Sequence, residues 1–65
     1  MTFTLKACRV NKNLSLEDAA KELGISLHTL KNYEAGTTYP PIDIVFKMLA
    51  LYKVKIEAVD FLIKD

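Results

Sequence analysis

The 65-residue sequence has few of the residues that cross-link or interrupt a chain: one cysteine, two glycines, two prolines and no tryptophan. A single thiol forms no intramolecular disulfide and builds no cysteine-based metal site, so Cys8 is interpreted as a small core residue. The sequence also has no long apolar run. Lys47 interrupts the most hydrophobic stretch, between Ile44 and Tyr52, which is far too short to span a bilayer. The sequence therefore predicts a chain with no disulfide and no membrane contact.

Charge of one sign is also scarce. Nine basic and eight acidic residues leave a net charge of +1. Many nucleic-acid-binding proteins are strongly basic, so any contact with DNA here must come from where charges are placed rather than from their sum. Lys6 and Arg9 interrupt any apolar segment that could serve as a signal peptide, and we expect a cytoplasmic protein.

The sequence shows no catalytic pattern. Its acidic residues are scattered without pairing, and it has no nucleophile–base set and no phosphate-binding loop. His28 is the only histidine, and no second histidine or cysteine ligand accompanies it. We therefore expect no enzyme activity, metal, cofactor or small-molecule ligand.

Helical periodicity organises the whole chain, with no sustained period-two alternation. The hydrophobic fraction of 51% favours a folded protein, and the length fits one domain over residues 1–65. In so short a chain some apolar side chains must face a partner, so self-association is expected. We predict an all-α fold of five short helices: one over residues 5–12, one from Leu16 to Leu23, one from Leu27 to Ala35, one from Ile42 to the break at residues 53–55, and one from Ile56 to Ile63.

The stretch from Ser15 to Gly36 is the most informative. Ser15 and Ser26 are good N-caps, and Gly24 is suited to a left-handed residue at a helix end. Only Gly24-Ile25-Ser26 joins the two helices, a connection that fits helices crossing at a steep angle. Ala20 is small where the second helix must approach, and Ile25 and Leu30 fill the corner.

These residues resemble the Cro/lambda-repressor-like (XRE) helix-turn-helix domain. The resemblance is carried by residues 14–26, Leu30, Tyr33-Glu34-Ala35-Gly36 and Pro40, and it extends from about Leu5 to Val59. It implies a compact five-helix lambda-repressor-like bundle whose helix-turn-helix motif, at about residues 16–35, lies in helices 2 and 3. It also implies that the second helix of the motif lies in the major groove of DNA.

The resemblance implies a set of DNA-contacting residues. Base contacts are expected from the side of the recognition helix opposite Leu30 and Tyr33, namely Leu27, His28, Lys31 and Asn32. Phosphate contacts are expected from flanking residues: Lys12, Asn13, Ser15, Leu16, Ser26, Thr29, Thr37, Thr38 and Tyr39. Tyr39 has the alternative of stacking within its loop.

Two residues depart from the family pattern. Leu16 stands where the family usually has a glutamine that binds a phosphate, and the loop after Gly36, often basic in relatives, reads Thr-Thr-Tyr. Both changes lower the expected affinity for DNA. Binding is therefore expected to depend on dimerisation.

Two structural roles complete the prediction. Arg9 and Glu34 match a family pair that forms a salt bridge between the first and third helices, the alternative being two separately solvated charges. In helix 4, Ile42, Val45, Phe46 and Leu49 form one apolar stripe, and Ile44, Met48 and Leu51 form a second. A homodimer interface is expected from the last two helices, through Met48, Leu51, Phe61 and Leu62, with simple core packing as the alternative.

The expected function is sequence-specific binding of double-stranded DNA by a small transcriptional regulator. A dimer would read a pseudo-palindromic operator, and the short chain favours a Cro-like repressor from a phage, mobile element or bacterial genome. A protein-interaction module on the same fold, such as an antitoxin or adaptor, is the main alternative. A third is a domain cut from a longer chain.

Overall fold

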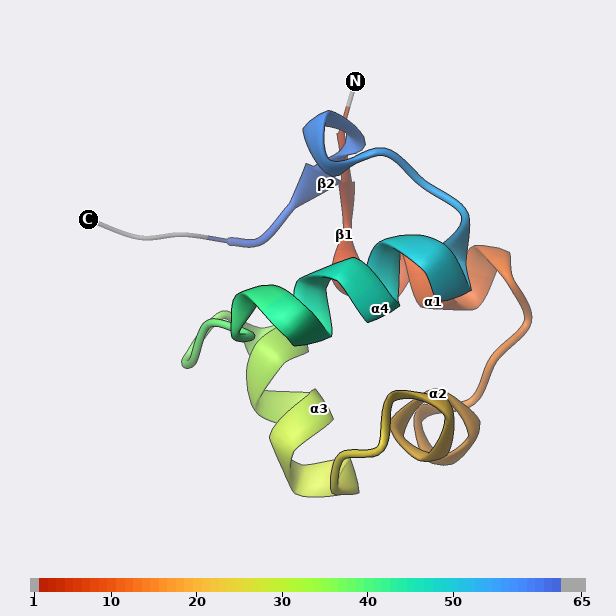
Figure 1. Cartoon of the computed structure of the whole chain (residues 1–65), viewed down its shortest axis with the longest axis vertical. Coiled ribbons are helices and arrows are strands. Elements are labelled where there is room, and N and C mark those ends of the chain that lie inside the picture. Colours follow the sequence, from red (N-terminus) through yellow and green to blue (C-terminus); the bar gives the residue numbers. More distant parts are fainter. Residues whose placement is uncertain (1, 63–65) are drawn as a thin grey trace.

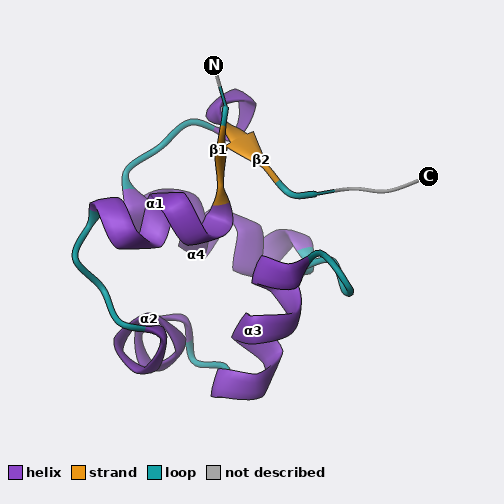
Figure 2. Ribbon diagram, turned by 180° about the vertical axis from the view of Figure 1, so that it is seen from behind, coloured by secondary structure: helices purple, strands orange, loops and turns teal. Residues whose placement is uncertain are grey.

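The computed structural model describes residues 2–62. In chain order the elements are β1 (Phe3–Thr4), α1 (Leu5–Asn11), α2 (Leu16–Leu23), α3 (Leu27–Ala35), α4 (Ile42–Tyr52), the 3-10 turn η1 (Ile56–Ala58) and β2 (Val59–Asp60) (Figure 1). Helices α1 and α4 lie on one side of the core and α2 and α3 on the other, while the two strands meet at the end of the molecule away from α2 (Figure 2). Among the described residues, the predicted all-α fold class is therefore correct for α1 to α4, whereas the short strand pair was not predicted.

Serine and threonine side chains start three of the helices. The hydroxyls of Thr4, Ser15 and Ser26 accept hydrogen bonds from the backbone N–H three residues on, at 3.1, 3.0 and 3.1 Å. Each bond satisfies one of the free donors that a helix N-terminus leaves. The two serine caps that the sequence predicts are confirmed, and Thr4 is a further one.

Glycine ends the two helices of the motif. Gly24 and Gly36 take the left-handed conformation, with φ of 72° and 78°, which other residues adopt only at a cost. Gly36 has a second constraint. A Cβ atom there would lie 2.9 Å from the Cβ of Leu62, so the chain before the C-terminus packs directly against the end of α3.

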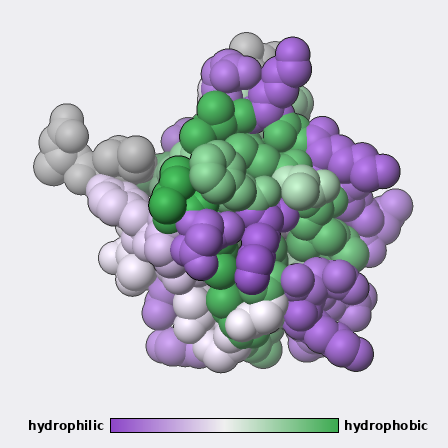
Figure 3. All heavy atoms as spheres, in the orientation of Figure 1, coloured by the Kyte–Doolittle hydropathy of each residue, from purple (hydrophilic) through white to green (hydrophobic). Residues whose placement is uncertain are grey.

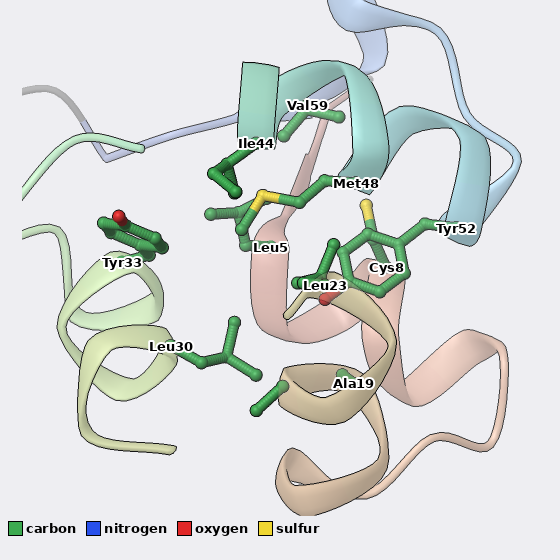
Figure 4. Packing of buried hydrophobic residues seen from close by; sticks show 11 residues of the cluster. Leu5, Cys8, Ala19, Leu23, Leu30, Tyr33, Ile44, Met48, Tyr52 and Val59 are labelled. Carbon is green, nitrogen blue, oxygen red and sulfur yellow. The ribbon is translucent and has the colours of Figure 1, made fainter. Parts of the chain in front are cut away.

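One apolar core joins all four helices (Figure 4). Leu30 of α3 and Ala19 of α2 have no exposed surface, and the Leu30 side chain reaches toward α2 in the close view. The other buried hydrophobic members of this core are Leu5, Cys8, Ala20, Leu23, Tyr33, Ile44, Met48, Tyr52 and Val59. Cys8 is thus a core residue, as the sequence predicts.

The prediction of a fifth helix over residues 56–63 is wrong. The described part of this segment is the single turn η1 followed by β2, which pairs in parallel with β1 so that Phe3 lies opposite Val59. A helix this short cannot offset the cost of its first turn, whereas Val59 gains both a ladder partner and a buried side chain. Ile63 lies outside the described residues.

The predicted faces of α4 also need correction. Val45, Met48 and Tyr52, at i, i+3 and i+7, face the core together with Ile44, while Ile42 and Phe46 are each 63% exposed. Met48 is 1% exposed and packs between α1 and the other helices, so it cannot belong to a dimer interface as predicted. The stripe through Ile42 and Phe46 is the one left uncovered.

Candidate nucleic-acid interface

The connection between α2 and α3 sets the geometry of the site. Gly24 ends α2 in the left-handed conformation, and the Ile25 amide donates a hydrogen bond to the Ala20 carbonyl at 3.0 Å. Ser26 then caps the start of α3. In Figure 1, α2 is seen end-on while α3 lies across the view, so the two axes cross steeply. Leu30 and Tyr33, both buried, anchor α3 on this support. The other side of α3 is held outward on a rigid base.

Four predicted base-contacting residues share that outer side. At 100° per residue, Leu27, Lys31, His28 and Asn32 fill one arc of about 140°, on the side of the helix away from the buried pair Leu30 and Tyr33. The first three are exposed and Asn32 is half-buried. An amide, an ammonium, an imidazole and an apolar chain over two turns form a set that can read base edges. The structure thus brings the four predicted residues together.

The hydroxyls at the start of α3 are already partly occupied. Besides capping the helix, the Ser26 hydroxyl lies 2.8 Å from the Thr29 hydroxyl, and the two form a hydrogen bond. After the helix, the Thr37 hydroxyl donates to the Asn32 carbonyl at 3.2 Å. Three predicted phosphate contacts would therefore use the hydrogen-bonding capacity that these internal bonds leave.

The N-termini of α2 and α3 differ in charge. The first turn of α2 carries Glu17 and Asp18, whereas that of α3 has no acidic residue. Carboxylates neutralise the positive end of the helix dipole and repel an approaching phosphate. The N-terminus of α3 is therefore the better place for an anion, and the phosphate contact predicted at Ser15 and Leu16 competes with two carboxylates.

The remaining predicted phosphate contacts lie on two loops. Lys12 and Asn13 are exposed before α2, with Asn13 in the left-handed region at φ 57°. Leu16 is half-buried and packs against the core. Thr38 and Tyr39 are exposed after α3, Tyr39 to 53%.

Arg9 and Glu34 form a two-point ion pair. The Arg9 Nε donates to Glu34 Oε2 at 2.7 Å and Nη2 donates to Oε1 at 3.3 Å, while Nη1 donates to the Leu14 carbonyl at 2.8 Å. Both side chains are 9% exposed. The hydrogen bond to Glu34 raises the pKa of Arg9, which keeps the guanidinium charged. This cluster joins α1, α3 and the connection before α2, so it fixes how α3 is held.

Tyr52 is a neighbour of this ion pair that sequence reasoning missed. Its side chain is buried and its hydroxyl is the one buried polar side-chain group without a hydrogen-bond partner in the described chain. Burial raises the pKa of Tyr52 to about 12, and the negative charge of Glu34 adds to this shift. The spacing of Val45, Met48 and Tyr52 was the available signal for a core position.

The described residues lack two other kinds of feature. They contain no group of three or more histidine, cysteine or acidic residues that could hold a metal ion. Among the described residues, no helix combines the length and apolar character needed to cross a bilayer. Of the residues predicted for a dimer interface, Leu51, Phe61 and Leu62 are half-buried.

Comparison with known proteins agrees with this geometry. The sequence profile of a family described as helix-turn-helix matches residues 5–59, which include α1 to α4 and the strand residue Val59. The chain is 39% identical over 65 residues to a protein of Methanocaldococcus jannaschii named as an uncharacterized HTH-type transcriptional regulator. The match covers 100% of this chain and 97% of that relative. No solved structure shows a significant match.

Proposed function

This chain belongs to the helix-turn-helix family of the XRE type, and we propose that it binds double-stranded DNA sequence-specifically as a small transcriptional regulator. One observation carries the proposal. The first two turns of α3 hold Leu27, His28 and Lys31 exposed on a helix whose opposite side is fully anchored in the core. The family is not enzymatic, and the proposed activity is binding alone.

Each side chain on this surface can contact a particular base. Asn32 pairs bidentately with adenine, His28 or Lys31 donates to the acceptors of guanine, and Leu27 packs on the methyl group of thymine. The N-terminus of α3, free of acidic residues, lets the helix approach the negatively charged groove. These interactions supply specificity.

Phosphate contacts position the helix without reading the sequence. We assign them to residues on either side of α3: Lys12, Asn13, Ser15 and Leu16 before it, Ser26 and Thr29 at its start, and Thr37, Thr38 and Tyr39 after it. With a net charge of +1 and leucine at position 16, a single copy binds weakly. The proposed regulator is therefore a dimer on a pseudo-palindromic operator with half-sites about 34 Å apart, in the manner of a Cro-like repressor of a phage or mobile element.

Selection from a random duplex library, followed by titration of the selected sequence at several salt concentrations, tests this function. Asn32→Ala is expected to weaken binding by about 1–3 kcal/mol and to relax the preference at one base pair. Lys31→Ala is expected to do the same at another position. The matched control is Lys55→Ala, which removes an exposed lysine on the strand side of the molecule and should leave binding unchanged.

Two outcomes would contradict the proposal. One is the absence of any enriched sequence, with affinity at low salt no greater than for random DNA. The other is equal weakening by Lys31→Ala and Lys55→Ala, which would indicate only a general attraction to phosphates.

A protein-interaction module, as in an antitoxin or adaptor, is the second candidate. The features that favour it are the low net charge, Leu16 in place of a polar anchor, and the carboxylates of Glu17 and Asp18 beside that position. On this alternative the exposed residues of α3 contact a protein. Substitutions at Lys31 and Asn32 would then change partner binding while no DNA sequence is selected.

A further inference from the structure

We propose that an exposed apolar surface centred on α4 is the dimer interface, and that its occupant is a second copy of this chain. This surface, the α4 patch, consists of Tyr39, Ile42, Phe46, Ile56 and Phe61. The inference deepens the proposed function, because it supplies the partner that weak monomer binding requires. It also replaces the interface expected from the sequence, since Met48 is buried in the core.

The α4 patch gathers much of the exposed apolar surface on one face. Ile42 and Phe46 are 63% exposed, Tyr39 is 53% exposed and Ile56 is 49% exposed. Figure 3 shows hydrophobic side chains collected over α4 and toward the strand end, bordered by charged groups. Val10 is also exposed, but it lies on α1. Within residues 2–62, one face of α4 is therefore left without a packing partner.

The patch combines an open groove with a protruding aromatic side chain. Tyr39, Ile42, Val45, Ile56 and Phe61 line an open groove of about 220 Å³, with Pro40 at its edge. Phe46 projects one helical turn from Ile42, beside this groove. A protruding aromatic side chain next to a groove that can receive one allows each copy to insert its Phe46 into the other. When a two-fold axis relates the two copies, Phe46 of each copy enters the groove of the other.

The charges beside the patch have the same symmetry. Asp43 and Lys47 are exposed on the same helix, one turn apart, and no ion pair joins them among the described residues. When two α4 helices pair antiparallel across a two-fold axis, Asp43 of each copy comes within reach of the partner's Lys47. The proposed dimer thus contains two ion pairs between the copies, each joining Asp43 of one copy to Lys47 of the other.

The exposed apolar area of the patch fits a weak dimer. With about 200 Å² for each large side chain, the exposed parts of the patch amount to roughly 450 Å² per copy. A small specific interface buries roughly 600–800 Å² per partner, so a stable dimer also has to cover polar residues around the patch. The patch omits Leu27, His28 and Lys31, so a second copy leaves these proposed base-contacting residues free. Tyr39 belongs both to the patch and to the proposed phosphate contacts, and in the dimer it is covered by the partner, so the other phosphate contacts hold the DNA.

Sedimentation equilibrium over a wide concentration range tests the interface without DNA. The wild-type chain is expected to form dimers. Phe46→Glu is expected to raise the dissociation constant at least about 30-fold, as for loss of an aromatic anchor at an interface centre. Val10→Glu is the matched control, an exposed apolar residue outside the patch, and should leave the dimer intact. Thermal unfolding by circular dichroism verifies that both variants fold.

Charge reversal tests the two-fold arrangement. Asp43→Lys and Lys47→Asp each place like charges opposite each other and should weaken the homodimer. An equimolar mixture of the two variants restores unlike pairs, so it should form a heterodimer tighter than either homodimer. Equal association in all three samples would overturn the proposed orientation.

DNA binding separates this inference from the proposed function. Phe46→Glu should lose affinity for a two-half-site operator and keep wild-type affinity for an isolated half-site. A wild-type chain that stays monomeric and fills two half-sites independently overturns the interface while the DNA-binding function stands. A dimer sensitive to Phe46→Glu that selects no DNA sequence overturns the function while the interface stands. Association with a different protein through the patch, without self-association, also overturns it.

Discussion

Breaking the ion pair between Arg9 and Glu34 is the perturbation with the largest expected effect. Glu34→Ala removes both acceptors of the guanidinium and leaves Arg9 charged, with its side chain 9% exposed. Removing one partner of a buried pair costs about 3–5 kcal/mol, because the remaining charge has lost its compensation. At roughly 0.05–0.15 kcal/mol per residue, a 65-residue chain has about 3–10 kcal/mol of stability, so this loss is between about a third and the whole of it.

Urea unfolding followed by far-ultraviolet circular dichroism measures the effect, since the chain has no tryptophan for fluorescence. Arg9→Ala is expected to cost at least as much as Glu34→Ala, because the Leu14 carbonyl also loses its donor. The double variant Arg9→Met, Glu34→Leu should recover much of the loss, since it buries no unpaired charge. Glu22→Ala, which removes an exposed carboxylate from α2, is the control and should change stability by less than about 0.5 kcal/mol.

A loss below about 1 kcal/mol for both single alanine variants would refute this reasoning, because that is the worth of a solvent-exposed pair. A double variant as unstable as either single one would also refute it. The cost would then come from lost packing rather than from an uncompensated charge.

Three further substitutions follow from the local geometry. Gly24→Ala, which meets open space, should cost about 1–2 kcal/mol for the left-handed conformation alone, and Gly36→Ala should cost more in the same thermal melts because its Cβ would lie 2.9 Å from Leu62. Ser26→Ala should destabilise the protein by about 1 kcal/mol, because the N-cap hydrogen bond of α3 is lost. Ser15→Ala removes the equivalent cap of α2 and should cost no more than this. Because burial raises the pKa of Tyr52 from 10.0 to about 12, its contribution to stability is complete below pH 10 and is lost as pH rises toward 12, by up to about 3 kcal/mol. Tyr52→Phe should unfold like the wild type at pH 7, where the hydroxyl has no partner, and should abolish that alkaline loss; a wild-type stability that stays flat to pH 12 would contradict the shift.

The features that could be predicted from the sequence depend on neighbours along the chain. Ser15 and Ser26 act on amides three residues away, and Gly24 and Gly36 satisfy a conformation that no other residue adopts cheaply. These short-range rules place α2 and α3 at the predicted residues, together with the outward arc of α3.

The features that could not be predicted depend on contacts between distant segments. Pairing of Val59 with Phe3 decides that the last segment is a strand, although its periodicity favours a helix. The core face of α4 includes Tyr52, although its side chain carries a polar hydroxyl, and excludes Phe46, the more hydrophobic residue. Only packing with α1 and α2 separates these faces.

The candidate site divides in the same way. The arc of Leu27, His28, Lys31 and Asn32 follows from helical geometry once Leu30 is buried. The bond between Ser26 and Thr29 and the carboxylates at the start of α2 were both visible in the sequence spacing, but their effect on phosphate contacts becomes clear only with the helices in place. The ion pair of Arg9 with Glu34, 25 residues apart, came from the family resemblance.

The parallel pairing of β1 with β2 has a mechanical consequence. In a parallel pair, the start of the first strand and the end of the last strand lie at opposite ends of the ladder. Tension applied between the two chain ends therefore runs along the strands and loads their hydrogen bonds together in shear, rather than peeling them apart one by one. The two-residue strands β1 and β2 therefore carry the load between the two ends of the chain. The helices are not pulled apart until this strand pair separates.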